Sequence, residues 1–195
     1  HLGGRRTIKT KNNGQSIDTS MGMSPQSGVD HSTRNGDLDV FAVLHVMDKE
    51  GLSTSDVRRI LCKEAGLAGI SGTSGDVRDL EAASASGNDR ARLALDVFCY
   101  NVKKTIGAMA AALGGLDVIG LAGGIGERGV NVRKRILNGL DFLGVALDEE
   151  RNSAHTGQEG VISTDASPVK VVVVCTNEEL IVARSVFALL SGNAS

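Results

Sequence analysis

The sequence predicts one α/β domain in which a mixed β-sheet is flanked by helices. Two short apolar runs rich in β-branched residues, 116–121 and 168–175, are typical of buried strands. A long amphipathic pattern over residues 88–113 predicts a helix that packs against them. The 195 residues are 41% hydrophobic, with 25 glycines, two prolines and no tryptophan, which favours a glycine-turned α/β domain over a disordered or fibrous chain.

Composition excludes several functional classes. A net charge of −2 and a pI near 6.1 leave no basic face, so we expect no nucleic-acid partner. The cysteines are odd in number and form no C-x-x-C pair, which argues against a disulfide framework or a zinc site and favours the cytoplasm: Cys62, Cys99 and Cys175. The longest apolar runs are too short to span a bilayer, so no membrane partner is expected. Because the chain opens on His1 rather than methionine, we expect it to be part of a longer protein.

The first 37 residues predict a hairpin and then a long loop. Residues 5–20 alternate in character around Asn13-Gly14, a dipeptide favoured where both central turn residues need positive φ. Residues 21–37 contain glycine, proline, serine and aspartate without periodicity, which predicts a loop. Loops of this length in a compact domain are usually functional or mobile.

Residues 37–78 predict two short helices and a second loop. Residues 37–49 and 53–65 each begin with a capping type of residue, and Gly51 and Gly66 are the predicted stops. Residues 69–78, GISGTSGDVR, are rich in glycine and serine and predict the loop.

The remaining pattern predicts a long helix followed by alternating strands and helices. Between residues 88 and 113 the apolar or small positions recur at steps of three and four, over about 40 Å of helix at 1.5 Å per residue, and Gly114-Gly115 ends it. The later expected elements are a helix over 130–139, a strand and connector over 145–154, a buried strand over 168–175 and a helix over 179–190.

A glycine turn follows the first buried strand. In Ala122-Gly-Gly-Ile-Gly-Glu127 the glycines would let the backbone approach a ligand, and a following helix would direct N–H groups at a phosphate. Tight packing alone explains such a turn equally well. The segment is neither a Walker A loop nor a G-x-G-x-x-G dinucleotide motif, so a dehydrogenase-type domain is disfavoured.

Four segments resemble motifs of the acetate kinase family, in the same order. Residues 18–22 (DTSMG) and 33–39 (TRNGDLD) resemble its arginine loop, and residues 66–79 (GLAGISGTSGDVRD) are similar to its GLLGISG-x-S-x-DMRD motif. Residues 122–127 resemble its AGIGEN turn, and residues 176–184 (TNEELIVAR) its TNEELMIAR motif. The resemblance covers nearly the whole chain and matches the C-terminal half of such enzymes.

The resemblance implies a ribonuclease H-like domain of the actin, hexokinase and sugar-kinase superfamily. Residues 1–195 would be the C-terminal nucleotide-binding domain of a two-domain acyl kinase, with the N-terminal domain absent from this chain. The implied reaction is ATP + acetate = ADP + acetyl phosphate, with propionate or butyrate as alternative acceptors. A homodimer through this domain is also implied, and the apolar stripe from Ala91 to Ala112 is either a contributor to that contact or plain core.

The resemblance also implies roles for individual residues. Arg34 would clamp the moving phosphoryl group, because its planar fork of donors fits phosphate or carboxylate oxygens, and His1 would lie near the same group. Glu178 would hold Mg²⁺ or Mn²⁺, directly or through water, although an acidic residue at this position also serves as a helix cap. The nucleotide would contact two segments: Asp76, Val77 and Arg78, and Gly123, Gly124, Ile125 and Gly126. Asp76 is equally a candidate cap for a helix entering Leu80.

The chain departs from the family motif at its start. Where the family has HLGNG, this sequence has HLGGR, so that Gly4 replaces asparagine and Arg5 replaces the last glycine. Arginine adopts positive φ only at a cost, which puts the geometry of this phosphate loop in doubt. A non-catalytic nucleotide-binding module of the same fold is therefore the second hypothesis.

Overall fold

The computed structural model describes residues 7–177 together with residues 183, 184, 186, 187, 189 and 190. The strands are β1 (Lys9–Asn12), β2 (Gln15–Thr19), β3 (Val118–Ala122), β4 (Gly160–Val161) and β5 (Lys170–Val174). The helices are α1 (Val40–Glu50), α2 (Thr54–Arg59), α3 (Gly66–Ser71), α4 (Val77–Ala85), α5 (Asp89–Leu113), α6 (Gly123–Arg128), α7 (Val130–Leu137) and α8 (Glu149–Ala154). A π-helical turn (Ile60–Glu64) continues α2, and a 3₁₀ turn (Asp141–Leu143) follows α7.

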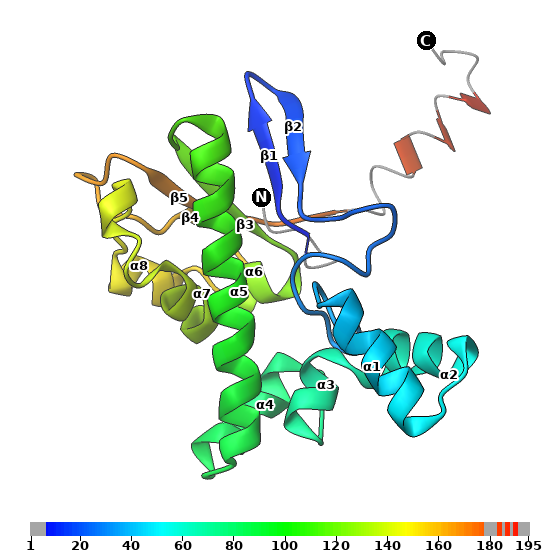
Figure 1. Cartoon of the computed structure of the whole chain (residues 1–195). Helices are drawn as coiled ribbons and strands as arrows, with labels where there is room; N and C mark the ends of the chain where they lie inside the picture. Colours follow the sequence, from blue (N-terminus) through cyan, green and yellow to red (C-terminus); the bar gives the residue numbers. More distant parts are fainter. Residues whose placement is uncertain (1–6, 178–182, 185, 188, 191–195) are drawn as a thin grey trace.

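The predicted mixed sheet flanked by helices is confirmed. Strand order is β3-β5-β4, with β3 parallel and β4 antiparallel to β5. Val171 and Val173 of β5 are fully buried, as expected of a central strand between two neighbours. Figure 1 shows this sheet behind the long helix α5.

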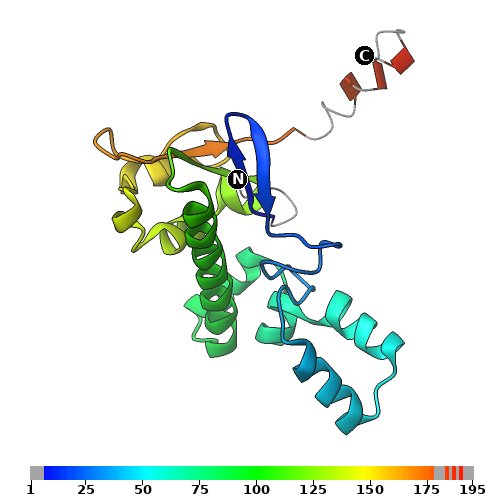
Figure 2. The same cartoon turned by 45° about the horizontal axis from the view of Figure 1, so that its top comes forward.

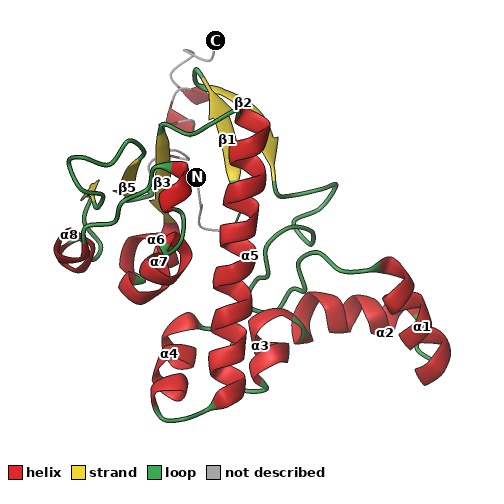
Figure 3. Ribbon diagram, turned by 60° about the vertical axis from the view of Figure 1, so that its left-hand side comes forward, coloured by secondary structure: helices red, strands yellow, loops and turns green. Residues whose placement is uncertain are grey.

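The predicted hairpin is also confirmed, and it forms its own two-stranded sheet. Strands β1 and β2 pair antiparallel around Asn13 (φ 49°) and Gly14 (φ 82°), so both turn residues take the positive φ that the dipeptide predicts. In Figure 3 the hairpin stands beside the C-terminal end of α5. The loop predicted after it contains no helix or strand between Thr19 and Val40.

Helix α5 organises the core. Its predicted stripe is buried at Leu95, Phe98, Val102 and Met109, and the helix packs against α3, α4, α7 and β1. The exceptions in the stripe are Thr105, which is half-buried, and Ala112, which is exposed. Because most of the stripe is internal, it is core rather than a surface for a second subunit.

The helices α1 and α2 form an arm that projects from the rest of the molecule (Figures 1 and 2). Helix α1 begins later than predicted, because its cap is Asp39 rather than Asp37. Ser53 caps α2 in a capping box and Gly51 ends α1 in the left-handed conformation, as predicted. Helix α1 has no buried residue, and Phe41 is 79% exposed.

Three predicted elements are wrong. The loop predicted over residues 69–78 overlaps α3 and the start of α4, and Gly66 begins α3 rather than only ending the previous helix. The glycine turn over residues 122–127 is mostly the helix α6, which follows β3 directly. The strand predicted over residues 145–154 is reduced to isolated bridges at Val145 and Leu147, and its second half is α8. Of the helix predicted over residues 179–190, the described residues 183, 184, 186, 187, 189 and 190 are helical, and the others lie outside the described residues.

No helix in the described part of the chain is both long enough and apolar enough to cross a membrane. All three cysteines are free, in agreement with the prediction that they form no disulfide.

Candidate functional site

Two of the predicted site segments leave the sheet side by side. Strands β3 and β5 are parallel neighbours, and their last residues, Ala122 and Val174, are paired in register. Helix α6 follows β3, and residues 175–177 follow β5, so both segments start at the carboxyl edge of the sheet. Ligands of open α/β sheets bind at this edge. We call residues 122–128 together with residues 175–177 the sheet-end region.

The three glycines of α6 are required for different reasons, or for no packing reason at all. Gly123 takes φ 71°, which turns the chain from extended Ala122 into the helix. A Cβ on Gly126 would lie 2.7 Å from the carbonyl carbon of Leu121, so this glycine lets α6 pack on β3. Gly124 is exposed, and a Cβ there would meet nothing within 4 Å. Of these three glycines, only Gly124 is left without a packing reason, and a ligand has room to approach it.

A single carboxylate oxygen joins the two halves of the sheet-end region. Oε1 of Glu127 accepts hydrogen bonds from the amide of Gly123 (3.1 Å), the amide of Thr176 (3.0 Å) and the hydroxyl of Thr176 (3.0 Å). These donors, above all the Thr176 amide, hold the pKa of Glu127 below its usual value. The charged form of Glu127 therefore links α6 to the segment that follows β5.

A buried arginine holds α6 from its other end. The Arg133 side chain of α7 is 1% exposed and donates to the carbonyl oxygens of Gly126 and Glu127, each at 2.9 Å. It also donates to the side chain and carbonyl of Asn152 and to the carbonyl of His155. No carboxylate is among these acceptors. The charge instead faces the C-terminal ends of α6 and α8, where helix dipoles favour a cation; burial lowers the pKa of Arg133.

The predicted phosphoryl clamp, Arg34, lies on a loop held by main-chain hydrogen bonds. Thr33 and Ser32 accept from the amides of Ala65 (3.1 Å) and Ala68 (2.9 Å), and His31 accepts from Leu67 (3.0 Å). The contact is close, because a Cβ on Gly66 would lie 2.5 Å from the carbonyl oxygen of Arg34. We call residues 28–37 together with residues 65–78 the arginine-loop region.

The Arg34 side chain itself is half-buried and has no polar partner among the described residues. In the part of the chain that the structure describes, its guanidinium makes no hydrogen bond or ion pair. An unpaired guanidinium on a fixed backbone is suited to bind phosphate or carboxylate oxygens in a bidentate manner.

The predicted adenosine contacts occupy the start of α4. Asp76 caps this helix by accepting from the amide of Arg78 (2.9 Å), which confirms its predicted capping role. Its carboxylate also pairs with the exposed Arg78 guanidinium (2.6 Å), and this pairing raises the pKa of Arg78. Val77 lies between them and is buried, so a ligand could reach only its backbone.

The predicted catalytic His1 and metal ligand Glu178 lie outside the described residues. Within the described ranges, no cluster of three or more His, Cys, Asp or Glu side chains could hold a metal ion. A magnesium ion bound with nucleotide uses only one or two carboxylates and takes its other ligands from water and phosphates. Asn177, the last described residue before Glu178, comes directly after Thr176, which donates to Glu127 of α6.

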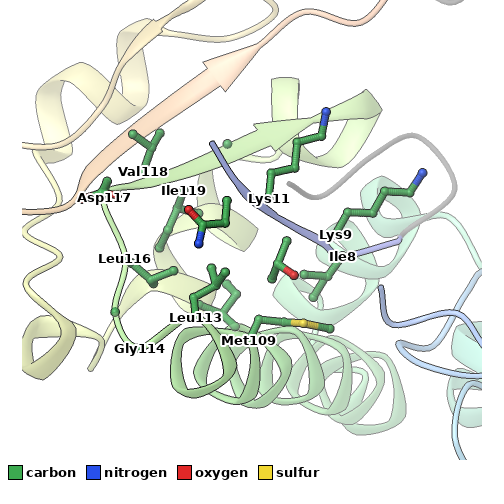
Figure 4. Close-up of a pocket in the computed structure, with 15 residues that line it drawn as sticks. Ile8, Lys9, Lys11, Met109, Leu113, Gly114, Leu116, Asp117, Val118 and Ile119 are labelled. Carbon is green, nitrogen blue, oxygen red and sulfur yellow. The ribbon is translucent and has the colours of Figure 1, made fainter. Parts of the chain in front are cut away.

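A cavity among the described residues lies away from the predicted site residues. It has a volume of about 600 Å³ and lies between β1, the C-terminal end of α5 and the start of β3 (Figure 4). Its floor is apolar, with Met109 and Leu113, and Lys9 and Lys11 lie along β1. None of the predicted site residues lines it, and it is at the opposite end of β3 from Gly123.

Sequence reasoning missed the residues that hold the sheet-end region together. Glu127 and Thr176 stand inside the motifs for the glycine turn and the last helix, but 49 positions separate them, and nothing in the sequence indicates that they touch. Arg133 stands in the run Arg-Lys-Arg, which is typical of a solvated helix face. Only the tertiary structure distinguishes it from its neighbours.

Comparison with known proteins gives a consistent result. The model of the Acetokinase family matches residues 1–184. The acetate kinase of Thermoanaerobacterium thermosaccharolyticum is 51% identical over 185 residues, which are 94% of this chain and 46% of that protein. The acetate kinase of Bacteroides fragilis is 48% identical over 190 residues, 97% of this chain and 48% of that protein.

Solved structures agree. The crystal structure of Porphyromonas gingivalis acetate kinase matches with a TM-score of 0.92 and 38% identity, over 97% of this chain and 48% of that one. A propionate kinase from Francisella tularensis matches with a TM-score of 0.86 and 35% identity, over 94% of this chain and 47% of that one. The chain therefore spans about half the length of the relatives it matches.

Proposed function

The chain belongs to the acetokinase family, and from this we propose that it forms the nucleotide-binding part of a kinase that catalyses ATP + acetate = ADP + acetyl phosphate. Homology to acetate and propionate kinases supports a phosphotransferase that acts on a carboxylate. The observation that carries the nucleotide role is the sheet-end region, where Gly124 is open to a ligand and Glu127 fixes the neighbouring segment.

The chain acts as the C-terminal domain of a two-domain enzyme. Its relatives are about twice as long, and the remainder of such a protein supplies the acyl pocket and the other catalytic groups. The chain by itself is consequently inactive. Cytoplasmic ATP is the phosphoryl source, in keeping with the free cysteines.

Each predicted residue has a part in this proposal. The Arg34 guanidinium binds the phosphoryl oxygens as charge moves across them, which is the main way in which phosphoryl transfer is accelerated. Backbone atoms of Gly123–Gly126 approach the ribose and phosphates, and Asp76, Val77 and Arg78 lie along the adenosine. His1 lies near the transferred group.

Magnesium, or manganese in its place, is held by Glu178 together with water and the nucleotide phosphates. The bound ion neutralises the charge of the phosphates. The chain's own contribution is the carboxylate of Glu178, which comes two residues after Thr176 in the sequence.

Acetate is the proposed acceptor, and propionate or butyrate are the alternatives. The similarity to the Francisella tularensis propionate kinase is the reason to keep propionate as an alternative acceptor. One methylene group changes binding in an apolar pocket by only about 1–3 kcal/mol, so related enzymes differ little in sequence for this property.

The proposed assembly is a homodimer through this domain. Since the α5 stripe is core, the supporting feature is the exposed apolar side of the α1 arm, where Val40 and Phe41 are 64% and 79% exposed. Sedimentation of the wild-type chain and of Phe41→Ser measures the oligomeric state. The variant should dimerise more weakly than wild type, and a monomeric wild type would contradict the proposed homodimer.

Calorimetric titration of this chain with ADP, with and without magnesium, tests the nucleotide role. We expect saturable binding that strengthens with magnesium, and loss of that gain in Glu178→Ala. Glu179→Ala is the matched control, because it removes the neighbouring carboxylate and should keep the gain. Gly124→Ala should fold normally and bind ADP more weakly, since its Cβ meets only the approaching ligand.

Absence of binding at millimolar ADP would reject a preformed nucleotide site in this chain. Turnover by a full-length version would then separate a site that needs the other domain from a module that has lost catalysis. A magnesium gain that survives in Glu178→Ala would reject the metal assignment.

A further inference from the structure

The turn between α3 and α4 is held in shape by serine hydroxyls. Ser71, which is 2% exposed, accepts from the amides of Thr73 (3.1 Å) and Ser74 (3.3 Å) and donates to the carbonyl oxygen of Ser74 (2.9 Å). The hydroxyl of Ser74 in turn accepts from the amide of Asp76 (3.0 Å), the cap of α4. The turn therefore holds Gly75 at one position relative to both helices.

Gly75 lies directly against the backbone of the arginine loop. A Cβ on Gly75 would lie 2.1 Å from the hydroxyl oxygen of Ser32, 2.5 Å from its carbonyl oxygen and 2.8 Å from its carbonyl carbon. Two of these atoms belong to the backbone, so rotation of a side chain cannot make room. The φ of Gly75 is not positive, unlike that of Gly66, so this contact alone is what requires glycine.

The contact at Ser32 is close to Arg34 along a fixed piece of chain. The carbonyl oxygen of Ser32 also accepts from the amide of Ala68 in α3 (2.9 Å), and that of Thr33 accepts from the amide of Ala65 (3.1 Å). On the other side of Arg34, the amide of Asn35 donates to Leu61 (3.2 Å). A displacement of Ser32 should therefore also displace Arg34.

On its other side, Gly75 adjoins the segment predicted to contact adenosine. Asp76 caps α4, and Val77 and Leu80 of that helix are buried where α4 packs on α5. Gly75 thus stands between a segment fixed to α5 and the loop that carries Arg34.

We propose that Gly75 is a positioning residue that sets the separation between Arg34 and the segment 76–78. The inference rests on the proposed function for the roles of these two groups, while the packing contact itself does not. Adenosine and the transferred phosphoryl group lie at opposite ends of one nucleotide. The separation of the two segments therefore decides whether the phosphoryl group reaches Arg34 when adenosine is bound, and small errors in such placement are costly to the rate.

Hydrogen exchange on the chain without ligand tests the packing contact. In Gly75→Ala, the peptide that contains residues 65–68 should exchange about tenfold faster, because the carbonyl of Ser32 moves away from the amide of Ala68. Peptides of β3 and β5 should be unchanged, which shows that the fold is intact. Gly107→Ala is the matched control, since its φ is also not positive and a Cβ there would meet nothing within 4 Å.

Kinetics of a full-length version test the positioning role. In Gly75→Ala, kcat should fall about tenfold to a hundredfold, while KM for ATP changes by less than about threefold. In the Arg34→Ala background, the same substitution should change kcat by less than about threefold, because Gly75 acts through Arg34. A purely structural defect would instead lower kcat by the same factor in both backgrounds. Gly107→Ala should leave kcat unchanged.

Ser71→Ala is a second variant that introduces no clash. It removes the hydroxyl that shapes the turn, so Gly75 is held less firmly against Ser32. Its kcat should fall about threefold or more, and again only when Arg34 is present. This variant decides the question if Gly75→Ala does not fold.

The outcomes separate the two proposals. If the full-length wild type has no kinase activity, the proposed function fails, and hydrogen exchange alone still decides whether Gly75 holds the arginine loop. Unchanged exchange of residues 65–68 in Gly75→Ala overturns the inference. An equal loss of kcat with and without Arg34, in either variant, overturns it as well.

Discussion

The two regions that carry the predicted site residues are held in place by different means. In the sheet-end region, two charged side chains make the key contacts: Glu127 joins α6 to Thr176, and Arg133 holds the end of α6. In the arginine-loop region, main-chain hydrogen bonds and close glycine packing do so, and the side chain of Arg34 makes no ion pair in the part of the chain described. Substitution of a single charged side chain should therefore destabilise the sheet-end region, whereas only substitutions that disturb the backbone should destabilise the arginine-loop region.

Arg133→Met should give the largest loss of stability. It removes five hydrogen bonds from a side chain that is 1% exposed and leaves buried carbonyl oxygens without a donor, which should lower the free energy of unfolding by about 4 kcal/mol. Urea unfolding measures this. Arg135→Met, on the same helix, loses only a partly exposed ion pair with Asp96 and should cost less than about 1 kcal/mol. Equal losses would refute a special role for Arg133.

Gly66→Ala should give the next largest effect. Its φ is +61° and a Cβ would lie 2.5 Å from the carbonyl oxygen of Arg34, so both strain and a backbone clash oppose alanine, at about 2–3 kcal/mol. Gly51 has almost the same φ, +63°, with nothing within 4 Å of a Cβ, so Gly51→Ala should cost only about 1 kcal/mol. Thermal unfolding of the two variants measures the clash, because the difference between their stability losses excludes the strain that they share. The same loss in both would mean that close packing does not hold the arginine loop.

Arg34→Ala should give the smallest effect on stability. Because its guanidinium makes no hydrogen bond or ion pair with the described residues, the free energy of unfolding should change by less than about 0.5 kcal/mol. In a full-length version, by contrast, phosphoryl transfer should fall by about a thousandfold. Urea unfolding and kinase assays measure the two quantities. A large stability loss would show that the loop depends on this side chain after all.

Elements with strong local patterns could be predicted from the sequence. The hairpin follows from Asn13-Gly14, β3 and β5 from their β-branched runs, and α5 from 25 residues with apolar side chains at helical spacing. In these elements the local preference and the tertiary contacts agree.

The missed helices depend on tertiary contacts. Helix α3 contains two glycines and α6 three, so their intrinsic preference is against helix. Helix α3 is held by packing on α5 with Leu67 fully buried, and α6 by Arg133 and by its contact with β3. The α8 error was avoidable, because Asp148 followed by Glu149 and Glu150 is a helix-start signal. Strand β4 has only two residues and leaves no pattern.

The candidate site also has a part that the sequence predicts and a part that depends on tertiary contacts. The motifs pointed to Arg34 on the loop between β2 and α1, to Asp76 at the start of α4 and to the glycines of α6, and the capping role of Asp76 followed from its residue type. Whether these residues bind ligands stays a prediction. The bonds from Glu127 to Thr176 and from Arg133 to α6 could not be predicted, since they join residues brought together only when the sheet forms.

The free side of β3 has a practical consequence for work on the chain. Among the described residues, β3 pairs with β5 only, and its sequence, VIGLA, contains no charge or proline to discourage the addition of another strand. Strand β1, across the cavity, carries Lys9 and Lys11. We therefore expect concentrated solutions of the chain to aggregate through β3, and a lysine at the exposed Val118 to improve solubility.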